Sequence, residues 1–161
     1  MKNKKIYSDI KVFDSVDELP KPVYHLMQKA IAIKKDAYSP YSNFQVGAAV
    51  RLANDEIITG NNQENSSYPA GLCAERVALF YASAHYPNQA IKTIALTASP
   101  ADAPNEQPVP PCGSCRQVIA EYEYKFDQPI EIYCMGNRGN VIAVNSIKAL
   151  LPLAFDRSFL K

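Results

Sequence analysis

The sequence predicts an α/β fold: a three-layer α-β-α sandwich built around a mixed sheet of about five strands. Three observations support this class. A segment with helical periodicity lies near the start, two short strand patterns joined by a turn follow it, and helical segments then alternate with short apolar strands. The 161 residues, 47% of them hydrophobic, are enough for one domain with its own core.

The first helix and the hairpin are predicted from periodicity and turn residues. Residues 1–19 are expected to be an N-terminal extension of uncertain order, followed by a single domain over 20–161. Within 21–40, four apolar residues recur at helical spacing, and the helix should end before Pro40: Leu26, Ala30, Ile33 and Ala37. Strands are expected over 44–52 and 56–62, and the turn between them indicates a hairpin at the sheet edge.

The second half alternates helices and strands. Helices are expected over about 73–86, where Pro87 ends the first of them, and over about 112–124. Apolar, β-branched segments predict strands at 91–98, 129–136 and 140–145. A proline-rich loop, 99–111, separates the first of these strands from the helix that follows it.

The overall charge excludes some classes of partner. A net charge of +1 gives no strong field for attracting nucleic acid, so the expected ligand is small. No apolar run approaches the roughly 20 residues that cross a bilayer, and the basic start is interrupted before a secretion signal develops. Four cysteines in such a chain indicate a metal or catalytic role in a reducing compartment, so a cytoplasmic location is expected.

Two cysteines stand three residues apart in the segment PCGSCRQ, at the start of a predicted helix. Residues i and i+3 lie on one side of a helix, so Cys112 and Cys115 can bind one ion from a single turn. A helix N-terminus also lowers thiol pKa values, which favours thiolate ligands. Taken alone, the pair could be a redox couple, half of a structural zinc site, or part of a catalytic metal site.

A third cysteine favours the catalytic reading. Cys73 opens the other predicted helix, and Glu75 follows two residues later. Three protein ligands with one open position are typical of catalytic zinc, whereas a structural zinc is normally closed by four. A glutamate that is not a ligand can move protons beside the metal. Three thiolates leave the site negative, and Arg76 is the candidate for compensating that charge.

The fourth cysteine keeps a structural alternative open. Strand alternation places Cys134 on one face with Ile130 and Ile132, which predicts a buried free thiol. If Cys134 instead joined the other three, the site would be a closed structural zinc in a binding module.

The motifs C-A-E and P-C-x-x-C resemble those of the zinc-dependent cytidine deaminase family. The likeness covers about three quarters of the chain and extends to segments typical of the small, homotetrameric branch that deaminates nucleosides: AYSPYSNFQVGAA, NQENSSYPAGLCAER, PCGSCRQV and LLPLAF. The resemblance implies one zinc per subunit, with Glu75 as the proton shuttle and these ligands: Cys73, Cys112 and Cys115.

The resemblance also implies substrate contacts. Phe44 matches an aromatic residue that packs on the pyrimidine, and Ala74 matches a position whose backbone contacts the base. Asn62 and Glu64 match the pair that binds the ribose 3′-hydroxyl. Phe155 matches an aromatic residue lent by a neighbouring subunit, which places each active site at a subunit boundary. Many relatives read C-N-I-E-N at the ribose pair where this chain has NNQEN, so Asn61 and Gln63 depart from the pattern.

The implied reaction is hydrolytic deamination of cytidine and 2′-deoxycytidine to the uridines and ammonia, in pyrimidine salvage, by a zinc-activated water with a glutamate proton shuttle. A deaminase of another cytosine-bearing nucleoside, such as the blasticidin type, would carry the same metal motif. A nucleic-acid editing enzyme is disfavoured, because the charge is near neutral and the first ligand is Cys where many polynucleotide-acting relatives have His.

Overall fold

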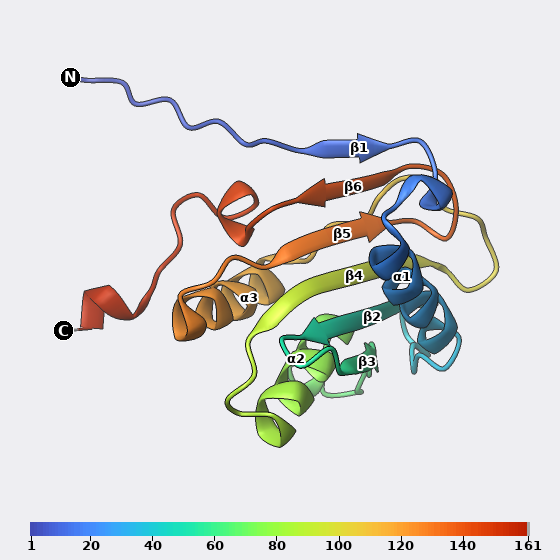
Figure 1. The fold of residues 1–161 in the computed structure, drawn as a ribbon. Coiled ribbons are helices and arrows are strands. Elements are labelled where there is room, and N and C mark those ends of the chain that lie inside the picture. Colours follow the sequence, from blue (N-terminus) through green and yellow to red (C-terminus); the bar gives the residue numbers. More distant parts are fainter. Residues whose placement is uncertain (161) are drawn as a thin grey trace.

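The computed structural model describes residues 1–160 and shows a six-stranded mixed sheet flanked by three α-helices (Figure 1). The strand order is β1-β6-β5-β4-β2-β3, in which β4 and β5 run parallel and all other neighbours run antiparallel. The strands are β1 (Lys11–Phe13), β2 (Phe44–Leu52), β3 (Ile57–Asn61), β4 (Ile91–Pro100), β5 (Glu131–Met135) and β6 (Val141–Val144). The helices are α1 (Lys21–Lys34), α2 (Ala74–His85) and α3 (Gly113–Phe126).

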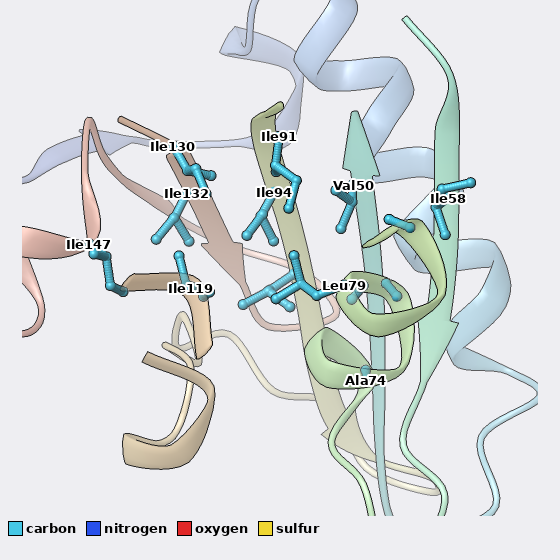
Figure 2. Packing of buried hydrophobic residues seen from close by; sticks show 14 of the residues in the cluster. Val50, Ile58, Ala74, Leu79, Ile91, Ile94, Ile119, Ile130, Ile132 and Ile147 are labelled. Carbon is cyan, nitrogen blue, oxygen red and sulfur yellow. The ribbon is translucent and has the colours of Figure 1, made fainter. Parts of the chain in front are cut away.

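The helices cover both faces of the sheet, so the predicted three layers are confirmed. On one face, α1 packs its buried Leu26, Met27 and Ala30 against the sheet. On the other face, α2 and α3 cover a larger core, in which Leu79 and Ile119 contact branched side chains of β4 and β5 (Figure 2). Because the sheet is covered on both faces, its central strand β4 is buried along nearly its whole length.

All five predicted strands and all three predicted helices are present. The hairpin of β2 and β3 lies at the sheet edge, as its turn residues indicate. The sixth strand, β1, comes from the N-terminal extension and was not expected. It pairs with β6 along only three residues, with Phe13 opposite Val141. So short a segment has no recognisable periodicity, and its pairing depends on a distant part of the chain.

The two cysteine-bearing segments meet on the face covered by α2 and α3. Cys73 is the N-cap of α2 and Cys112 is the N-cap of α3, so the N-termini of both helices lie at the same place. Within residues 1–160, no helix combines the length and apolar character that crossing a membrane requires.

Candidate active site

Three sulfur atoms converge where α2 and α3 begin. The ligating atoms of Cys73, Cys112 and Cys115 all lie within 4.8 Å of one another, and the Sγ atoms of Cys73 and Cys112 are 3.8 Å apart. Cys73 and Cys112 are caps with extended backbone, whereas Cys115 lies in the first turn of α3 and is fully buried. The predicted ligand set is therefore brought together by the fold.

A glycine on β3 permits the α2 end of this cluster. A Cβ atom added to Gly60 would lie 2.6 Å from the Ala74 carbonyl oxygen and 2.7 Å from the Ala78 nitrogen. No side chain fits in that space, so only glycine lets the first turn of α2 pack directly on β3. This close contact positions Cys73 and Glu75, which flank Ala74.

The fourth cysteine does not join the cluster. Cys134 is 2% exposed and packs with Ile130 and Ile132 in the core, as strand alternation predicted. Burial raises the pKa of its thiol. Among residues 1–160, the group that can hold a metal contains three cysteines, so the closed four-cysteine site is not formed.

The three sulfurs lie beside a positive charge. Nη2 of Arg76 is 3.7 Å from Cys73 Sγ, the position expected of a charge-compensating residue. A hydrogen bond from Cys115, together with this guanidinium, lowers the pKa of Cys73 to about 5. The same hydrogen bond and burial raise the pKa of Cys115. A metal ion would replace the shared proton and hold all three sulfurs as thiolates.

Glu75 is a buried carboxyl group next to the sulfurs. It is only 4% exposed, and burial is the main cause that raises its pKa, assisted by the negative charge of Cys73. A carboxyl group with a raised pKa can both accept and return a proton near neutral pH. Glu75 is thus suited to move protons at this site.

A pocket of about 660 Å³ opens onto the sulfurs and Glu75. Its size is in the range of small-molecule sites. Apolar and aromatic residues share its wall with polar and charged ones. The residues that line the pocket are Tyr41, Ser42, Phe44, Val46, Asn62, Gln63, Glu64, Asn65, Tyr68, Gly71, Leu72, Cys73, Glu75, Arg76, Leu96, Val109, Pro110 and Cys112. Three predicted substrate-binding residues, Phe44, Asn62 and Glu64, are therefore in the pocket wall.

Asn62 and Glu64 are held in place by β2 and the loop before it. The Asn62 amide accepts a hydrogen bond from the Val46 N–H (2.8 Å) and donates one to the Phe44 carbonyl (2.9 Å). One amide hydrogen and one lone pair are left for a ligand. The Glu64 carboxylate accepts hydrogen bonds from the N–H groups of Tyr41 and Ser42 and from the Ser42 hydroxyl.

Ser42 was not identified as a site residue from the sequence. It lies in the segment AYSPYSNFQVGAA, two residues before Phe44, so the segment was recognised but the residue had no assigned role. Its hydroxyl is the largest cause that lowers the pKa of Glu64, followed by the Tyr41 N–H. Glu64 therefore stays ionised to a lower pH than an ordinary glutamate.

The two residues that depart from the family pattern make a chain of hydrogen bonds beside the ribose pair. Gln63 Nε2 donates to Asn61 Oδ1 (2.6 Å), and Asn61 Nδ2 donates to the Ile33 carbonyl near the end of α1 (3.1 Å). The Gln63 backbone also exchanges hydrogen bonds with Leu72. These contacts tie the loop that carries Glu64 to α1 on one side and to the start of α2 on the other.

Two predicted contact residues do not line the pocket through their side chains. Ala74 is fully buried at the start of α2, between Cys73 and Glu75. Phe155 is 57% exposed, stacks on Phe159, and offers its carbonyl to the Gln117 side chain. The Phe155 ring is absent from the pocket wall of its own chain. The prediction that a neighbouring subunit supplies it stays a prediction.

The donor set fits zinc. Thiolate sulfur is a preferred zinc ligand, and three such ligands leave one of four tetrahedral positions for water or substrate. The pocket reaches Cys73 and Cys112, so that position has access to the cavity. Cys73, Cys112 and Cys115 would hold the ion.

Comparisons with known proteins agree with this geometry. The model of the cytidine and deoxycytidylate deaminase zinc-binding region matches residues 21–126. The chain is 41% identical to a cytidine deaminase of Halalkalibacterium halodurans over 130 residues, 81% of this chain and 91% of the relative. It is 37% identical to one of Sporosarcina psychrophila, over 84% of this chain and 92% of the relative.

Solved structures give the same result. The crystal structure of cytidine deaminase from Burkholderia pseudomallei superposes with a TM-score of 0.72 at 37% identity, over 82% of this chain and 98% of that one. The crystal structure of cytidine deaminase from Mycobacterium tuberculosis superposes with a TM-score of 0.62 at 29% identity, over 81% of this chain and 94% of that one. A matching zinc-binding region, a three-sulfur cluster and a shared fold lead to one conclusion: this chain belongs to the zinc-dependent cytidine deaminase family.

Proposed function

We propose that this protein hydrolyses cytidine and 2′-deoxycytidine to uridine and 2′-deoxyuridine with release of ammonia. The observation that carries the proposal is the buried Glu75 carboxyl beside three converging thiols, in the wall of a pocket large enough for a small molecule. The relatives named cytidine deaminase, which share two fifths of their residues or slightly fewer with this chain, support the same reaction.

Glu75 does the proton transfers in this proposal. When bound, zinc would supply a Lewis acid that makes a water molecule acidic at neutral pH. Glu75 accepts a proton from the attacking water and delivers it to N3 of the ring, while the water oxygen adds to C4. A second proton then passes through Glu75 to the amino group, which leaves as ammonia. The sum is cytidine plus water giving uridine plus ammonia.

The polar end of the pocket favours a nucleoside over its phosphate ester. Arg76 is the one cationic side chain in the pocket wall formed by the described residues, and it is already engaged with Cys73. Glu64, held as an anion, would repel a phosphate placed near the sugar. Asn62 and Glu64 are proposed to bind the 3′-hydroxyl, a group that both cytidine and 2′-deoxycytidine carry, so both are proposed as substrates.

We further propose that the active protein is a homotetramer with each site at a subunit boundary. Support comes from the exposed Phe155 ring, which stands outside the pocket of its own chain. Other large apolar side chains are also exposed near it: Leu153, Phe159 and Leu160. A second subunit could cover these side chains and receive Phe155.

The experiment is an ultraviolet assay on protein of known zinc content. Four substrates are compared: cytidine, 2′-deoxycytidine, cytidine 5′-monophosphate and blasticidin S. We expect turnover of cytidine and 2′-deoxycytidine. The kcat/KM for the monophosphate should be at least tenfold lower, because the anionic Glu64 repels its phosphate. Preference for blasticidin S would replace the proposal with the alternative deaminase class. Growth of a pyrimidine auxotroph on cytidine, dependent on this chain, tests the salvage role.

A further inference from the structure

The proline-rich loop between β4 and α3 forms part of the pocket wall. Its residues Val109 and Pro110 line the cavity, and the loop ends at the candidate zinc ligand Cys112. The position of this loop therefore affects the space available to a substrate. One set of contacts that holds the loop lies near the turn between β5 and β6 (Figure 1).

Asn105 connects the loop to two other segments. Its backbone N–H donates to Asn137 Oδ1 (2.7 Å), and its carbonyl accepts from the Asn137 N–H (3.0 Å). Its Nδ2 donates to the carbonyl of Ala98 on β4 (3.2 Å) and to that of Gln107 (3.0 Å), while its Oδ1 accepts from the Gln107 N–H (3.2 Å). All four polar groups of this one residue are thus engaged.

The turn is shaped to receive this residue. A Cβ atom added to Gly136 would lie 2.0 Å from the Asn105 carbonyl oxygen, so any larger residue at 136 would push the loop away. Gly136 is itself held, because its carbonyl accepts a hydrogen bond from the buried Thr97 hydroxyl (2.6 Å). The anchor for Asn105 therefore lies directly at the end of β5, where the buried Gly136 follows the strand.

The stretch between this anchor and the metal site is stiff. Residues 108–111 read PVPP, and each proline fixes its own φ angle near −65°. At the far end, Arg116 Nε donates to the Pro111 carbonyl (2.8 Å). A stiff segment held at both ends transmits a displacement at one end along its length, so releasing Asn105 moves Val109 and Pro110.

We propose that Asn105 is a positioning residue for the substrate, because it sets where Val109 and Pro110 stand against a bound nucleoside. This inference rests on the proposed function, since it assigns the loop to the binding of that substrate. The residue acts through the loop and does not touch the reacting atoms. Its loss should therefore weaken binding and leave the chemical step nearly unchanged.

The test is steady-state kinetics with cytidine on zinc-loaded wild type and Asn105→Ala. Losing the side-chain hydrogen bonds should raise KM about five- to twentyfold while kcat changes less than about twofold. Asn105→Ser keeps an oxygen that can accept a hydrogen bond from the Gln107 N–H. The KM of this variant should therefore lie between those of the wild type and Asn105→Ala. Glu106→Ala is the matched control: it removes only the exposed ion pair with Arg138 and should leave KM unchanged.

A second variant acts from outside the loop. Asn137→Ala removes the acceptor for the Asn105 N–H and should raise KM in the same direction, which decides the question if Asn105→Ala does not fold. Amide hydrogen exchange at Gln107 and Val109, whose neighbours Pro108 and Pro110 carry no N–H, should speed up in both variants and not in Glu106→Ala. Suppose that the wild type turns over cytidine and that Asn105→Ala has an unchanged KM, or loses only kcat. This inference would then be overturned, and the proposed function would stand. No wild-type turnover would overturn both.

Discussion

The Ser42 hydroxyl donates a hydrogen bond of 2.5 Å to the Glu64 carboxylate, across 22 residues of sequence. Two backbone N–H groups, from Tyr41 and Ser42, donate to the other carboxylate oxygen. This arrangement fixes both the direction and the charge of the proposed ribose-binding group. A side chain that is ordered before the ligand arrives loses less entropy on binding.

Glu64→Ala should raise the KM for cytidine about ten- to hundredfold with a smaller effect on kcat, because a charged acceptor for the sugar hydroxyl is lost. Ser42→Ala should act in the same direction but more weakly. An unchanged KM in Glu64→Ala would show that the sugar is bound elsewhere.

Ser42→Ala also makes a prediction about pH. The Ser42 hydroxyl is the main cause that lowers the pKa of Glu64, so its removal should raise that pKa. Glu64 is proposed to bind the sugar as an anion, and the anion is lost as the pH falls through the pKa. The acid-side increase in KM should therefore begin at a higher pH in Ser42→Ala than in wild type. Measuring the KM for cytidine of both proteins from about pH 4 to 7 checks the direction of this shift.

Glu75→Gln should lower turnover severely and leave the metal in place. The amide has nearly the same shape but cannot accept and return a proton, and loss of such a group typically lowers kcat about 10²- to 10⁴-fold. Zinc content is measured by atomic emission alongside the kinetics. Glu121→Gln, at an exposed position on α3, is the control and should match wild type in both. Activity retained in Glu75→Gln would eliminate the proposed shuttle.

The variants Cys73→Ala and Cys134→Ser should show that Cys73 binds zinc and that Cys134 is a core thiol without a role in the metal site. Cys73→Ala removes one of three donors, so zinc content should fall well below that of wild type. Cys134→Ser buries a hydroxyl among aliphatic side chains and should cost about 1–3 kcal/mol in the free energy of unfolding, with zinc retained. Zinc loss in Cys134→Ser would revive the closed structural site.

Phe155 tests the subunit boundary by complementation. Phe155→Ala should raise KM about tenfold if the ring packs on substrate. Subunits of Phe155→Ala mixed with Glu75→Gln and reassembled would contain sites that combine Glu75 from one chain with Phe155 from the other. Activity at low cytidine concentration should then exceed the sum of the two variants. Strict additivity would place Phe155 outside the neighbouring site.

Patterns with a short sequence period predicted most of the fold. The apolar face of α1 and the apolar run of β4 are local signals, and each gave an element of the right type in the right place. The end of α1 was predicted too late, because the helix stops at Lys34 and Ala37 lies outside it. β1 was missed because Lys11 and Val12 are exposed and its partner β6 lies some 130 residues away. Pairing of that kind depends on tertiary contacts and leaves no trace in three residues of sequence.

The residues of the candidate site also fall into those that the sequence predicted and those that it did not. The sulfurs and Glu75 were identified because thiol chemistry and helix spacing restrict where they can lie. Ser42 and Asn105 were not, since a serine or an asparagine in a loop has many ordinary roles and only the folded chain shows what it holds. Gln63 shows the same limit: its departure from the family pattern was visible, but its hydrogen bond to Asn61 was not.

The convergence of Cys73 and Cys112 has a thermodynamic consequence. These residues are 39 positions apart, and the intervening chain contains α2, β4 and the proline-rich loop. An ion held by both ends closes that length of chain much as a disulfide would, and it removes closure entropy from the unfolded ensemble. Chelators should therefore act as denaturants of this protein, with the melting temperature falling as the metal is withdrawn.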